Sequence, residues 1–550
     1  MVTRTGTTFN TELRIWTGPD RGYDSNVALG TYIFNYLKSE VGKHPEKVIQ
    51  IHHETDEKVT VADMYGRCIR LAVAFSEMQL KAGDAVVIVS RNIPLLMPVS
   101  VALQYLGVVI AYLDESTVLQ NAGSNDSALK RIAPQIVICN YSFAETVLKE
   151  VVAEKILTFD AYDSALTSVE DLLARNPRIN EKFRPVTIDH PDKVTAVILT
   201  TSGTTGASKF LSLSHASILN QCLRCHNFVN YGVIFHFVPM NWISGLDGGF
   251  GDLVRGKLRI TTAERPTPPI FVDVITKHRV TELFLDAGTL AVLAQYFHQT
   301  RPNLDSIKLV SCGGTSVSEQ LRLSIQDYTP NGVTIIGYGM TEVAGVLSAC
   351  YKPKSISVGL LCEGIQIKIC SPDGTYLGPL EHGEICAKTP HEFLDCLHNS
   401  PPREEFYDKD GWFLTNDIGY FDDEGFLFIL GRKQDMLQHL NHLVNPIVVE
   451  TILESHEGIF KACVVGVTIP VYYDLPVGIV QRTEGSTVTE DELHDFVKDK
   501  LPDEYHRLNG GIYFVDSFPR THTGKIKRLD VKNLALELYT DRVAAKQPKN

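Results

Sequence analysis

The chain has 550 residues, of which 44% are hydrophobic and 21% are charged, and its formal net charge is −13. A chain of this length is longer than a domain built around a single hydrophobic core, so we expect several subdomains. The composition is that of a globular protein. An acidic balance without a basic patch argues against a nucleic-acid binder, because such a surface repels phosphate backbones.

The first part of the chain alternates between helix and strand patterns. Thr60–Leu80 has the apolar spacing of an amphipathic helix, and Ala85–Val89 is a short apolar run typical of a buried strand. The alternation continues through residues 136–139 and 155–158, which predicts an α/β fold with helices covering a sheet. Prolines and polar residues interrupt the apolar stretch 93–113, so we expect a buried helix and strand there rather than a membrane span.

A polar, glycine-rich stretch, TTSGTTGASK at residues 200–209, lies between two apolar runs. Its glycines can adopt positive φ, its hydroxyl and N–H groups supply donors, and Lys209 adds a positive charge. A mononucleotide P-loop has the spacing G-x-x-x-x-G-K-[ST] and leads into a helix, whereas the spacing here is G-x-x-G-x-x-K and Phe210–Leu213 has a strand pattern. The stretch therefore predicts a phosphate clamp between two strands, although such a turn taken alone is more often a flexible polar hairpin.

Two later strands are predicted to end in glycine-rich turns. Lys308–Cys312 leads into Gly313-Gly314-Thr315 and then into a helix pattern at Ser318–Asp327, and Thr334–Ile336 leads into GYGMTE at residues 337–342. We expect both turns to close over one ligand.

A β-hairpin is predicted after residue 418. The segment DGWFLTNDI at 410–418 precedes this hairpin, DDEG at 422–425 forms its turn, and Phe426–Leu430 forms its return strand. The sequence GRKQD at 431–435 then breaks the pattern.

The remaining residues predict a small, separate α/β unit that ends in a second basic glycine turn, THTGK at 521–525. Its expected elements are a helix at Val448–Ser455, a strand at Ala462–Val467, a helix at Glu490–Lys500 and a strand at Gly511–Val515.

Taken together, the chain resembles the adenylate-forming superfamily of acyl-CoA synthetases, beetle luciferases and peptide-synthetase adenylation domains, and is most similar to insect luciferase-like acyl-CoA synthetases. The motifs that carry the resemblance occur in family order: TTSGTTGASK, CGGT, YGMTE, the Asp417 segment with GRKQD, and THTGK. The resemblance implies an α/β fold with a multi-subdomain N-terminal region (1–431), a hinge (432–435) and a small, mobile C-terminal α+β lid (436–550). It also implies that a carboxylate attacks the α-phosphorus of MgATP to give an acyl-adenylate and pyrophosphate, after which the thiol of coenzyme A displaces AMP.

The resemblance also implies the nucleotide contacts. The β- and γ-phosphates are expected at Thr201, Ser202, Gly203, Thr204, Thr205, Gly206 and Lys209. Adenine is expected to stack on Tyr338, beside Gly339, and to face Gly313, Gly314 and Thr315. Thr341 matches the residue that contacts the α-phosphate, and Glu342 matches the ligand of Mg²⁺, which is usually held by one or two carboxylates together with phosphates and waters.

Because one anion attacks another, such a site needs charge neutralisation and positioning more than a general base. By resemblance, Asp417 accepts the ribose hydroxyls, Arg432 reinforces it, and Lys525 bridges the substrate carboxylate and the α-phosphate. Trp242 and Gly245 are expected in the acyl pocket, where a large flat side chain suits either a shortened tunnel or an aromatic acid. Gln434 is expected at the hinge.

The sequence also departs from the family pattern. Ser208 and Phe210 replace a proline and a glycine beside Lys209, which predicts a bulkier exit from the clamp, and Asn416 replaces the glycine before Asp417. Asn441 replaces a glycine after the hinge, and Gln438 stands where luciferase-like relatives have a lysine that serves the second half-reaction. Adenylation is therefore better supported than thioester formation, and light emission is not expected.

We therefore predict an ATP-dependent acyl-CoA synthetase that uses Mg²⁺ and coenzyme A and acts on a fatty or aryl carboxylic acid. One alternative is an adenylating enzyme that passes its acyl group to an amine or to a carrier-protein thiol. Another is a non-catalytic acyl or nucleotide binder, which a Lys525→Ala variant that binds ATP without adenylating would exclude.

The expected compartment is the cytoplasm. Eleven scattered cysteines, an odd number, suit a reducing compartment, and no signal peptide leads the chain. A peroxisomal location is the alternative, but the C-terminal residues Gln547–Asn550 do not form an S-K-L-type peroxisomal address.

Overall fold

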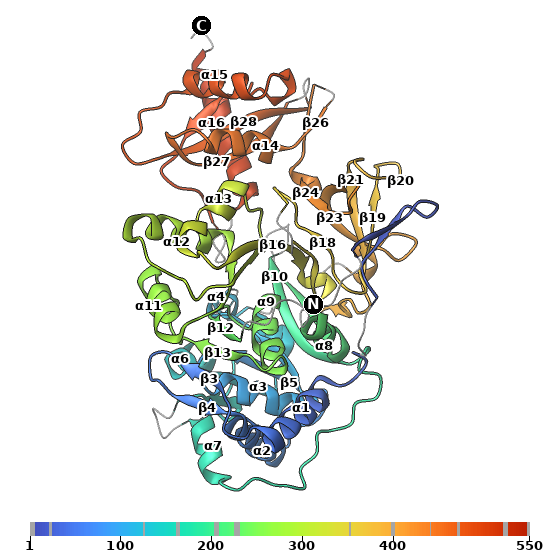
Figure 1. Ribbon diagram of the computed structural model, residues 1–550, viewed down its shortest axis with the longest axis vertical. Coiled ribbons are helices and arrows are strands. Elements are labelled where there is room, and N and C mark those ends of the chain that lie inside the picture. The colour runs from blue at the N-terminus through green and yellow to red at the C-terminus, as the bar shows by residue number, and fades with distance from the viewer. Residues whose placement is uncertain are drawn as a thin grey trace. The chain divides into compact units, whose positions relative to one another are not determined.

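The computed structural model describes residues 6–20, 25–120, 122–124, 127–160, 166–202, 208–224, 232–350, 354–397, 402–440, 442–469, 473–520 and 526–546 (Figure 1). The chain divides into two compact units: unit 1 comprises Met1–Ile367 and Ala387–Phe413, and unit 2 comprises Lys368–Cys386 and Leu414–Asn550. The expected hinge at 432–435 stays a prediction.

The first large sheet of unit 1 has eight described strands in the order β22-β11-β10-β6-β5-β7-β8-β9. Their bounds are β5 (Ala85–Val89), β6 (Val109–Tyr112), β7 (Ile136–Cys139), β8 (Ile156–Thr158), β9 (Thr167–Ser168), β10 (Thr195–Ser202), β11 (Ser208–Ser214) and β22 (Asp395–Cys396). From β9 to β10 neighbouring strands are parallel, and β11 is antiparallel to both β10 and β22. The predicted strands at 85–89, 136–139 and 155–158 are confirmed, and their continuous apolar character fits a sheet covered on both faces.

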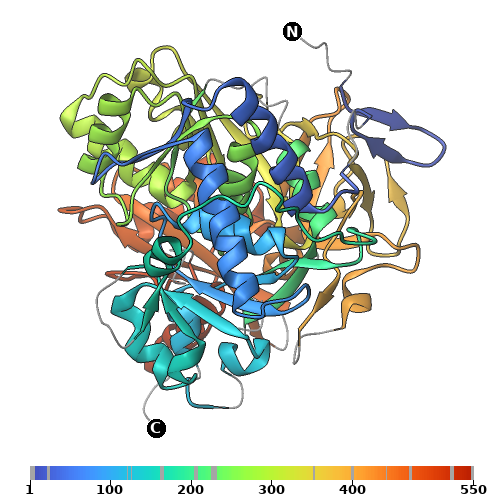
Figure 2. The ribbon, with the colours of Figure 1, turned by 90° about the horizontal axis from the view of Figure 1, so that it is seen from below.

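Three N-terminal helices lie side by side, as Figure 2 shows: α1 (Leu29–Lys43), α2 (Val61–Glu77) and α3 (Leu96–Tyr105). Helix α2 begins after Thr60, whose hydroxyl accepts a hydrogen bond from the N–H of Asp63 in a capping box, which confirms the predicted start. Helix α3 is buried along its whole length and is followed by β6, as predicted for 93–113. Within the described ranges, no helix combines the length and apolar character needed to cross a membrane.

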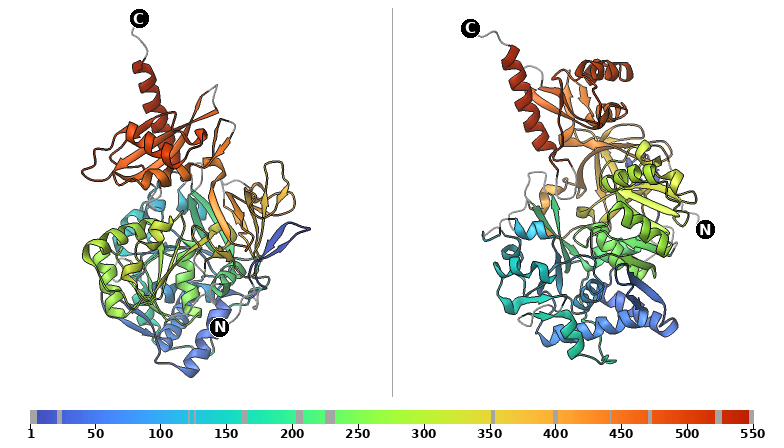
Figure 3. Two further views of the ribbon diagram at one scale, coloured as in Figure 1. Left: turned by 45° about the horizontal axis from the view of Figure 1, so that its top comes forward. Right: turned by 90° about the vertical axis from the view of Figure 1, so that its left-hand side faces the viewer.

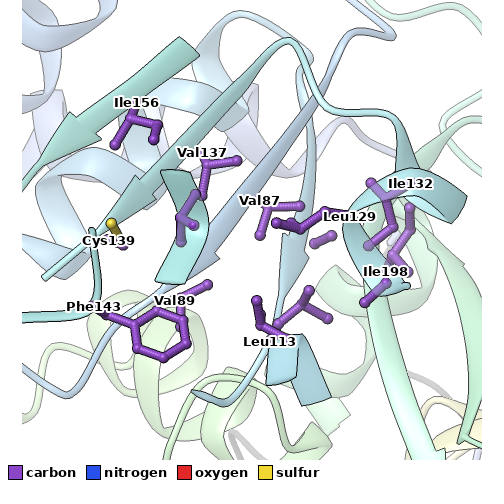
Figure 4. Close-up of a cluster of buried hydrophobic side chains, with 14 of the residues drawn as sticks. Val87, Val89, Leu113, Leu129, Ile132, Val137, Cys139, Phe143, Ile156 and Ile198 are labelled. Carbon is purple, nitrogen blue, oxygen red and sulfur yellow. The ribbon is translucent and has the colours of Figure 1, made fainter. Parts of the chain in front are cut away.

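A hydrophobic cluster packs against the first sheet (Figure 4). It joins Val87 of β5, Val137 of β7 and Ile198 of β10 to side chains of the short helices that follow β6 and β7. The remaining helices around this sheet are α4 (Glu115–Leu119), α5 (Ala128–Ile132), α6 (Tyr141–Leu148), α7 (Val169–Arg175) and α8 (His215–Arg224). Burial of these side chains is the main stabilising contribution to this part of unit 1.

The second large sheet of unit 1 has nine described strands in the order β18-β17-β16-β15-β14-β12-β13-β3-β4. Their bounds are β3 (Val48–His52), β4 (Lys58–Thr60), β12 (Val233–His236), β13 (Leu258–Thr261), β14 (Glu282–Asp286), β15 (Leu309–Gly313), β16 (Val333–Met340), β17 (Gly345–Ala349) and β18 (Leu360–Leu361). The strands from β3 to β16 pair in parallel. The helices between them are α9 (Ile243–Leu246), α10 (Asp252–Val254), α11 (Pro268–His278), α12 (Ala287–Thr300) and α13 (Glu319–Leu323).

The helix predicted at Ser318–Asp327 is shorter than expected. Ser318 caps it as its N-terminal residue, but α13 ends at Leu323, and Gln326–Tyr328 forms a separate 3-10 turn. Unit 1 also carries an antiparallel hairpin of β1 (Thr8–Asn10) and β2 (Ile15–Thr17).

Unit 2 contains the predicted hairpin of β23 (Phe413–Phe421) and β24 (Leu427–Arg432), with its turn at Asp422–Gly425. The residues predicted to precede the hairpin form most of its first strand. In the same sheet lie β19 (Gln366–Cys370), β20 (Tyr376–Leu377) and β21 (Gly383–Lys388).

The C-terminal part of unit 2 is built on a three-stranded sheet, against which the long helix α16 (Arg528–Lys546) packs (Figure 3). The strands are β27 (Ile459–Ile469), β28 (Tyr473–Arg482) and β29 (Ile512–Phe514). The other elements are β25 (Leu437–His439), β26 (His442–Val444), α14 (Pro446–Glu454) and α15 (Glu490–Lys500). All four elements predicted for this region are confirmed within a few residues, whereas β28 and α16 were not predicted.

Candidate active site

The predicted phosphate clamp lies between two paired strands. β10 and β11 are antiparallel, and their register pairs Thr201 with Lys209 and Ser202 with Ser208. The strand predicted after Lys209 is confirmed, because β11 runs to Ser214 before helix α8 begins. Gly203, Thr204, Thr205 and Gly206 lie outside the described residues, so their part in the clamp stays a prediction.

Lys209 contacts an aromatic ring that sequence reasoning did not identify. Its Nζ lies 4.7 Å from the centroid of the Phe406 ring, and Phe406 packs against Phe393 and Phe413. A cation over the face of a ring is attracted by the ring quadrupole. Phe406 ends a 3-10 turn, Arg403–Phe406, and no local sequence signal links this turn to Lys209.

The expectation that Phe210 makes the clamp exit bulkier is wrong. Successive side chains of a strand point to opposite faces. Lys209 is half-buried and reaches Phe406, whereas Phe210 is 2% exposed and belongs to the cluster that packs on the first sheet. The guanidinium of Arg131 lies 4.4 Å from the Phe210 ring centroid. The bulky side chain therefore fills the core.

The two predicted glycine-rich segments of the second sheet lie at one edge. β15 and β16 are parallel neighbours that pair Cys312 with Ile336, so Gly313-Gly314-Thr315 and the Tyr338 segment leave the same end of the sheet. Gly314 has φ of 85°, a conformation that favours glycine, and both it and Thr315 are exposed.

The second segment is not the turn that was expected. Gly337–Met340 continues β16 and pairs with β17, with Tyr338 opposite Ser348. A side chain at Gly339 would collide with the carbonyl oxygen of Gly345, so the glycine allows the two strands to approach closely. The turn begins only at Thr341.

Thr341 and Glu342 lie in this 3-10 turn, Thr341–Val343, and both are half-buried. Glu342 and Lys209 both influence Cys396, whose pKa is raised to about 11, first by burial and then by Asp395. The Lys209 ammonium lowers this pKa and the Glu342 carboxylate raises it. The segment 393–397 joins the two residues' elements, because the N–H of Phe393 donates to the carbonyl oxygen of Glu342 and the N–H of Leu397 donates to that of Phe210, next to Lys209. The structure thus brings two of the predicted catalytic residues into one region of unit 1.

Glu342 is a single half-buried carboxylate, which fits a Mg²⁺ ion that takes its other ligands from phosphates and water. In the part of the chain that the structure describes, no group of three or more His, Cys, Asp or Glu side chains is arranged to hold a metal. The assignment of Mg²⁺ to Glu342 stays a prediction.

Trp242 precedes helix α9 and is half-buried. Gly245 packs tightly in the same helix, where a side chain would collide with the carbonyl oxygen of Pro239. This close approach accounts for the glycine by packing alone, and the acyl-pocket roles of Trp242 and Gly245 stay predictions.

In unit 2, Asp417 and Arg432 face each other across the β23–β24 hairpin. Their backbones are register partners, and Nε of Arg432 lies 3.0 Å from Oδ1 of Asp417. Asp417 is buried, and the N–H of Asp417 donates to the hydroxyl of Thr415. The hairpin therefore fixes the carboxylate and pairs it with a cation, as expected from the sequence.

Asn416 has φ of 57°, in the left-handed region. The family pattern has glycine here, and asparagine is among the non-glycine residues that best tolerate this conformation. The exchange therefore keeps the backbone geometry that presents Asp417.

The remaining predicted residues lie beyond the hairpin or outside the described ranges. Gln434 is exposed in a 3-10 turn, Lys433–Asp435, and Gln438 is exposed on β25. Lys525 and Asn441 are outside the described residues. Arg520 and Ile526, on either side of the THTGK motif, form an antiparallel bridge.

An ionic cluster that sequence reasoning missed links three segments of unit 2. Nη2 of Arg528 lies 2.6 and 2.7 Å from the two carboxylate oxygens of Glu450, and Nε of Arg528 lies 3.6 Å from Asp435. Burial raises the pKa of both carboxyl groups, and the arginine opposes that shift. The cluster ties the start of α16 to α14 and to the residue that follows Gln434.

Two family models and several named proteins match this chain. A family model described as AMP-binding enzyme matches residues 37–394, and one described as AMP-binding enzyme C-terminal domain matches residues 448–525. The chain is 30% identical to 4-coumarate–CoA ligase 3 of Oryza sativa subsp. japonica, covering 96% of each chain. It is 26% identical to probable 4-coumarate–CoA ligase 1 of Dictyostelium discoideum, covering 91% of this chain and 94% of that protein.

Solved structures share the fold. ATP-bound MatB from Rhodopseudomonas palustris matches with a TM-score of 0.81 at 22% identity, covering 94% of this chain and 100% of that chain. The luciferase-like enzyme from the nonluminescent Zophobas morio mealworm matches with a TM-score of 0.68 at 24% identity, covering 76% of this chain and 99% of that chain.

Proposed function

This chain belongs to the AMP-binding enzyme family, and on that premise we propose that it is an AMP-forming acid–CoA ligase whose substrate is an aromatic carboxylic acid. It activates the acid with ATP to an acyl-adenylate and then forms the coenzyme A thioester. The observation that carries the proposal is the Asp417–Arg432 pair, which the hairpin fixes. It is supported in unit 1 by the backbone hydrogen bonds that join the turn of Glu342 to the strand of Lys209 through the segment 393–397.

Each of these residues has a task that follows from its chemistry. Lys209 is a mobile cation that neutralises phosphate oxygens, and Thr201 adds a hydroxyl beside it. The Asp417 carboxylate accepts hydrogen bonds from the ribose hydroxyls, and Arg432 holds its orientation. Thr341 donates to the α-phosphate. When bound at Glu342, Mg²⁺ would neutralise charge on the phosphates.

Lys525 is the cation that we assign to the transition state of adenylation. The attacking carboxylate and the α-phosphate are both anionic, so a positive charge placed between them lowers the barrier. Removing one such preorganised charge contact costs on the order of 100- to 1000-fold in rate.

Two observations favour an aromatic acid over a long aliphatic one. Relatives matched over almost their whole length are named 4-coumarate–CoA ligases. The half-buried Trp242 offers a flat ring, which stacks well on another ring. A 4-hydroxycinnamate-type acid is therefore the first substrate to test, and fatty acids of increasing length form the comparison series.

The test is ATP–pyrophosphate exchange over this acid panel, followed by AMP release with and without coenzyme A. Exchange with an aryl acid and AMP release stimulated by coenzyme A are expected. Exchange without stimulation would point to a different acceptor, such as an amine or a carrier-protein thiol. ATP binding without exchange for any acid, in the wild type and in Lys525→Ala alike, would reject catalysis altogether.

A further inference from the structure

Two cysteines of unit 2 face each other across neighbouring strands. Cys370 ends β19 and Cys386 lies in β21, and the Sγ of Cys386 is 3.5 Å from the Sγ of Cys370. Neither cysteine forms a disulfide bond in the structure. A disulfide bond is about 2.05 Å long, so bond formation requires the sulfur atoms to approach by roughly 1.5 Å more. No role in acid activation has been assigned to either residue.

The two thiols differ in accessibility. Cys370 is partly exposed, whereas Cys386 is buried. Because Cys370 is the more exposed of the two, an oxidant from solution reaches it first.

A buried lysine lies beside this pair. Tyr376 of β20 is the register partner of Cys370, and its hydroxyl accepts a hydrogen bond of 2.8 Å from the buried Nζ of Lys368.

The environment of Cys386 disfavours its thiolate form while Cys370 is a thiol. The pKa of Cys386 is raised, first by its hydrogen bond to Cys370 and then by burial, while the Lys368 ammonium opposes the shift. Once Cys370 has become part of a mixed disulfide, its thiol no longer disfavours a thiolate at Cys386. Lys368 then stabilises the nucleophile that attacks.

We propose that Cys370 and Cys386 form a reversible intramolecular disulfide, with a low-molecular-weight disulfide such as oxidised glutathione as the oxidant. In the first step the Cys370 thiolate attacks the glutathione disulfide, forms a mixed disulfide and releases one glutathione thiolate. In the second step the Cys386 thiolate attacks Sγ of Cys370 and releases the second glutathione. Two protein thiols thus lose two electrons and two protons, and one glutathione disulfide becomes two thiols.

The bond would link β19 to β21 and close the chain segment 371–385. A closed loop of this length restricts the unfolded chain, so the oxidised protein is expected to unfold at a higher temperature, by roughly 2 to 3 °C. The bond also lies two residues from Glu384, whose carboxylate is 2.6 Å from Nζ of Lys433 at the start of the expected hinge. Oxidation therefore stiffens the strand that anchors this lysine.

The experiment uses the reduced, full-length protein, equilibrated without oxygen in buffers of increasing ratio of oxidised to reduced glutathione. Free thiols are then alkylated, and the peptides are mapped without reduction. We expect two of the eleven thiols to be protected and one peptide pair, Cys370 with Cys386, to be linked. Dithiothreitol should restore both thiols.

Three variants test the order of events. Cys386→Ser should stop at a glutathione adduct on Cys370, and Cys370→Ser should give no adduct at position 386. Cys396→Ser, which removes another partly exposed thiol, should still form the link. A wild-type protein that keeps all eleven thiols in oxidised glutathione, or that links Cys370 to another cysteine, would overturn the proposal, whether or not the variants fold.

Discussion

At the residue scale, the contact between Lys209 and Phe406 gives a direct test of how the clamp lysine is positioned. Phe406→Leu keeps an apolar side chain of similar size but removes the ring that lies 4.7 Å from Nζ. A cation–π contact at a partly exposed site contributes about 0.5 to 1 kcal/mol, so KM for MgATP should rise by roughly 2- to 5-fold with little change in kcat.

The matched control is Phe413→Leu, which alters a neighbouring ring of the same aromatic cluster. It should lower the thermal midpoint and leave KM for MgATP unchanged. An unchanged KM in Phe406→Leu would show that the ring only packs against the lysine stem.

Asp417 provides a second test at this scale. Asp417→Asn keeps the size of the side chain but loses the charge that pairs with Arg432 at 3.0 Å and accepts the ribose hydroxyls. Hydrogen bonds to charged groups contribute about 1.5 to 3 kcal/mol, so ATP affinity should fall roughly 10- to 100-fold in equilibrium binding. Asp423→Asn, at the exposed turn of the same hairpin, should bind ATP like the wild type. Equal affinity in all three proteins would remove Asp417 from the ribose site.

At the element scale, the left-handed residue of β23 determines how the strand presents Asp417. Asn416→Val places a β-branched side chain at φ of 57°, which costs on the order of 1 to 2 kcal/mol, and ATP affinity should fall together with the thermal midpoint. Asn416→Gly suits the same conformation and should retain wild-type ATP affinity. A valine variant with normal affinity would show that the backbone at this position does not orient the carboxylate.

The elements that sequence could predict are those with strong local signals. Helix α15 begins at the Thr489 capping box and matches its predicted bounds, and the β23–β24 hairpin follows the Asp422–Gly425 turn. The strand character of Gly337–Met340 could not be predicted, because glycine-rich sequence is typical of turns. Pairing with β17 decides its conformation, and that partner became evident only in the structure.

At the scale of the whole molecule, the order of the motifs along the chain predicted the family, although no single motif did. Five short motifs in sequence identified a fold whose sheets bring residues such as Lys209 and Glu342 into one region. Contacts between segments that are distant in the sequence could not be predicted from it. Nothing near Lys209 in the sequence indicates Phe406, and the buried position of Phe210 follows from strand alternation only once β11 is placed in its sheet.

Two buried histidines predict how the fold of unit 1 responds to acid. Burial lowers the pKa of His215 to about 4, and burial together with Arg259 lowers the pKa of His236 to about 4. The unfolded chain binds these protons near pH 6.5, so between pH 6.5 and 4 it holds more protons than the folded chain. Stability is therefore complete above pH 6.5 and falls as the pH drops, by about 2 kcal/mol for each histidine at pH 5.

The measurement is the change in thermal midpoint between pH 7.5 and pH 5, compared among the wild type, His236→Gln and His298→Gln. Glutamine cannot titrate, so His236→Gln should lose a smaller part of its stability on acidification, even if its midpoint at pH 7.5 is already lowered. His298 is exposed on α12, so its substitution should leave the pH dependence unchanged. If His236→Gln loses as much stability between the two pH values as the wild type, the folded protein must protonate His236 without unfolding, and acid sensitivity must arise from other groups.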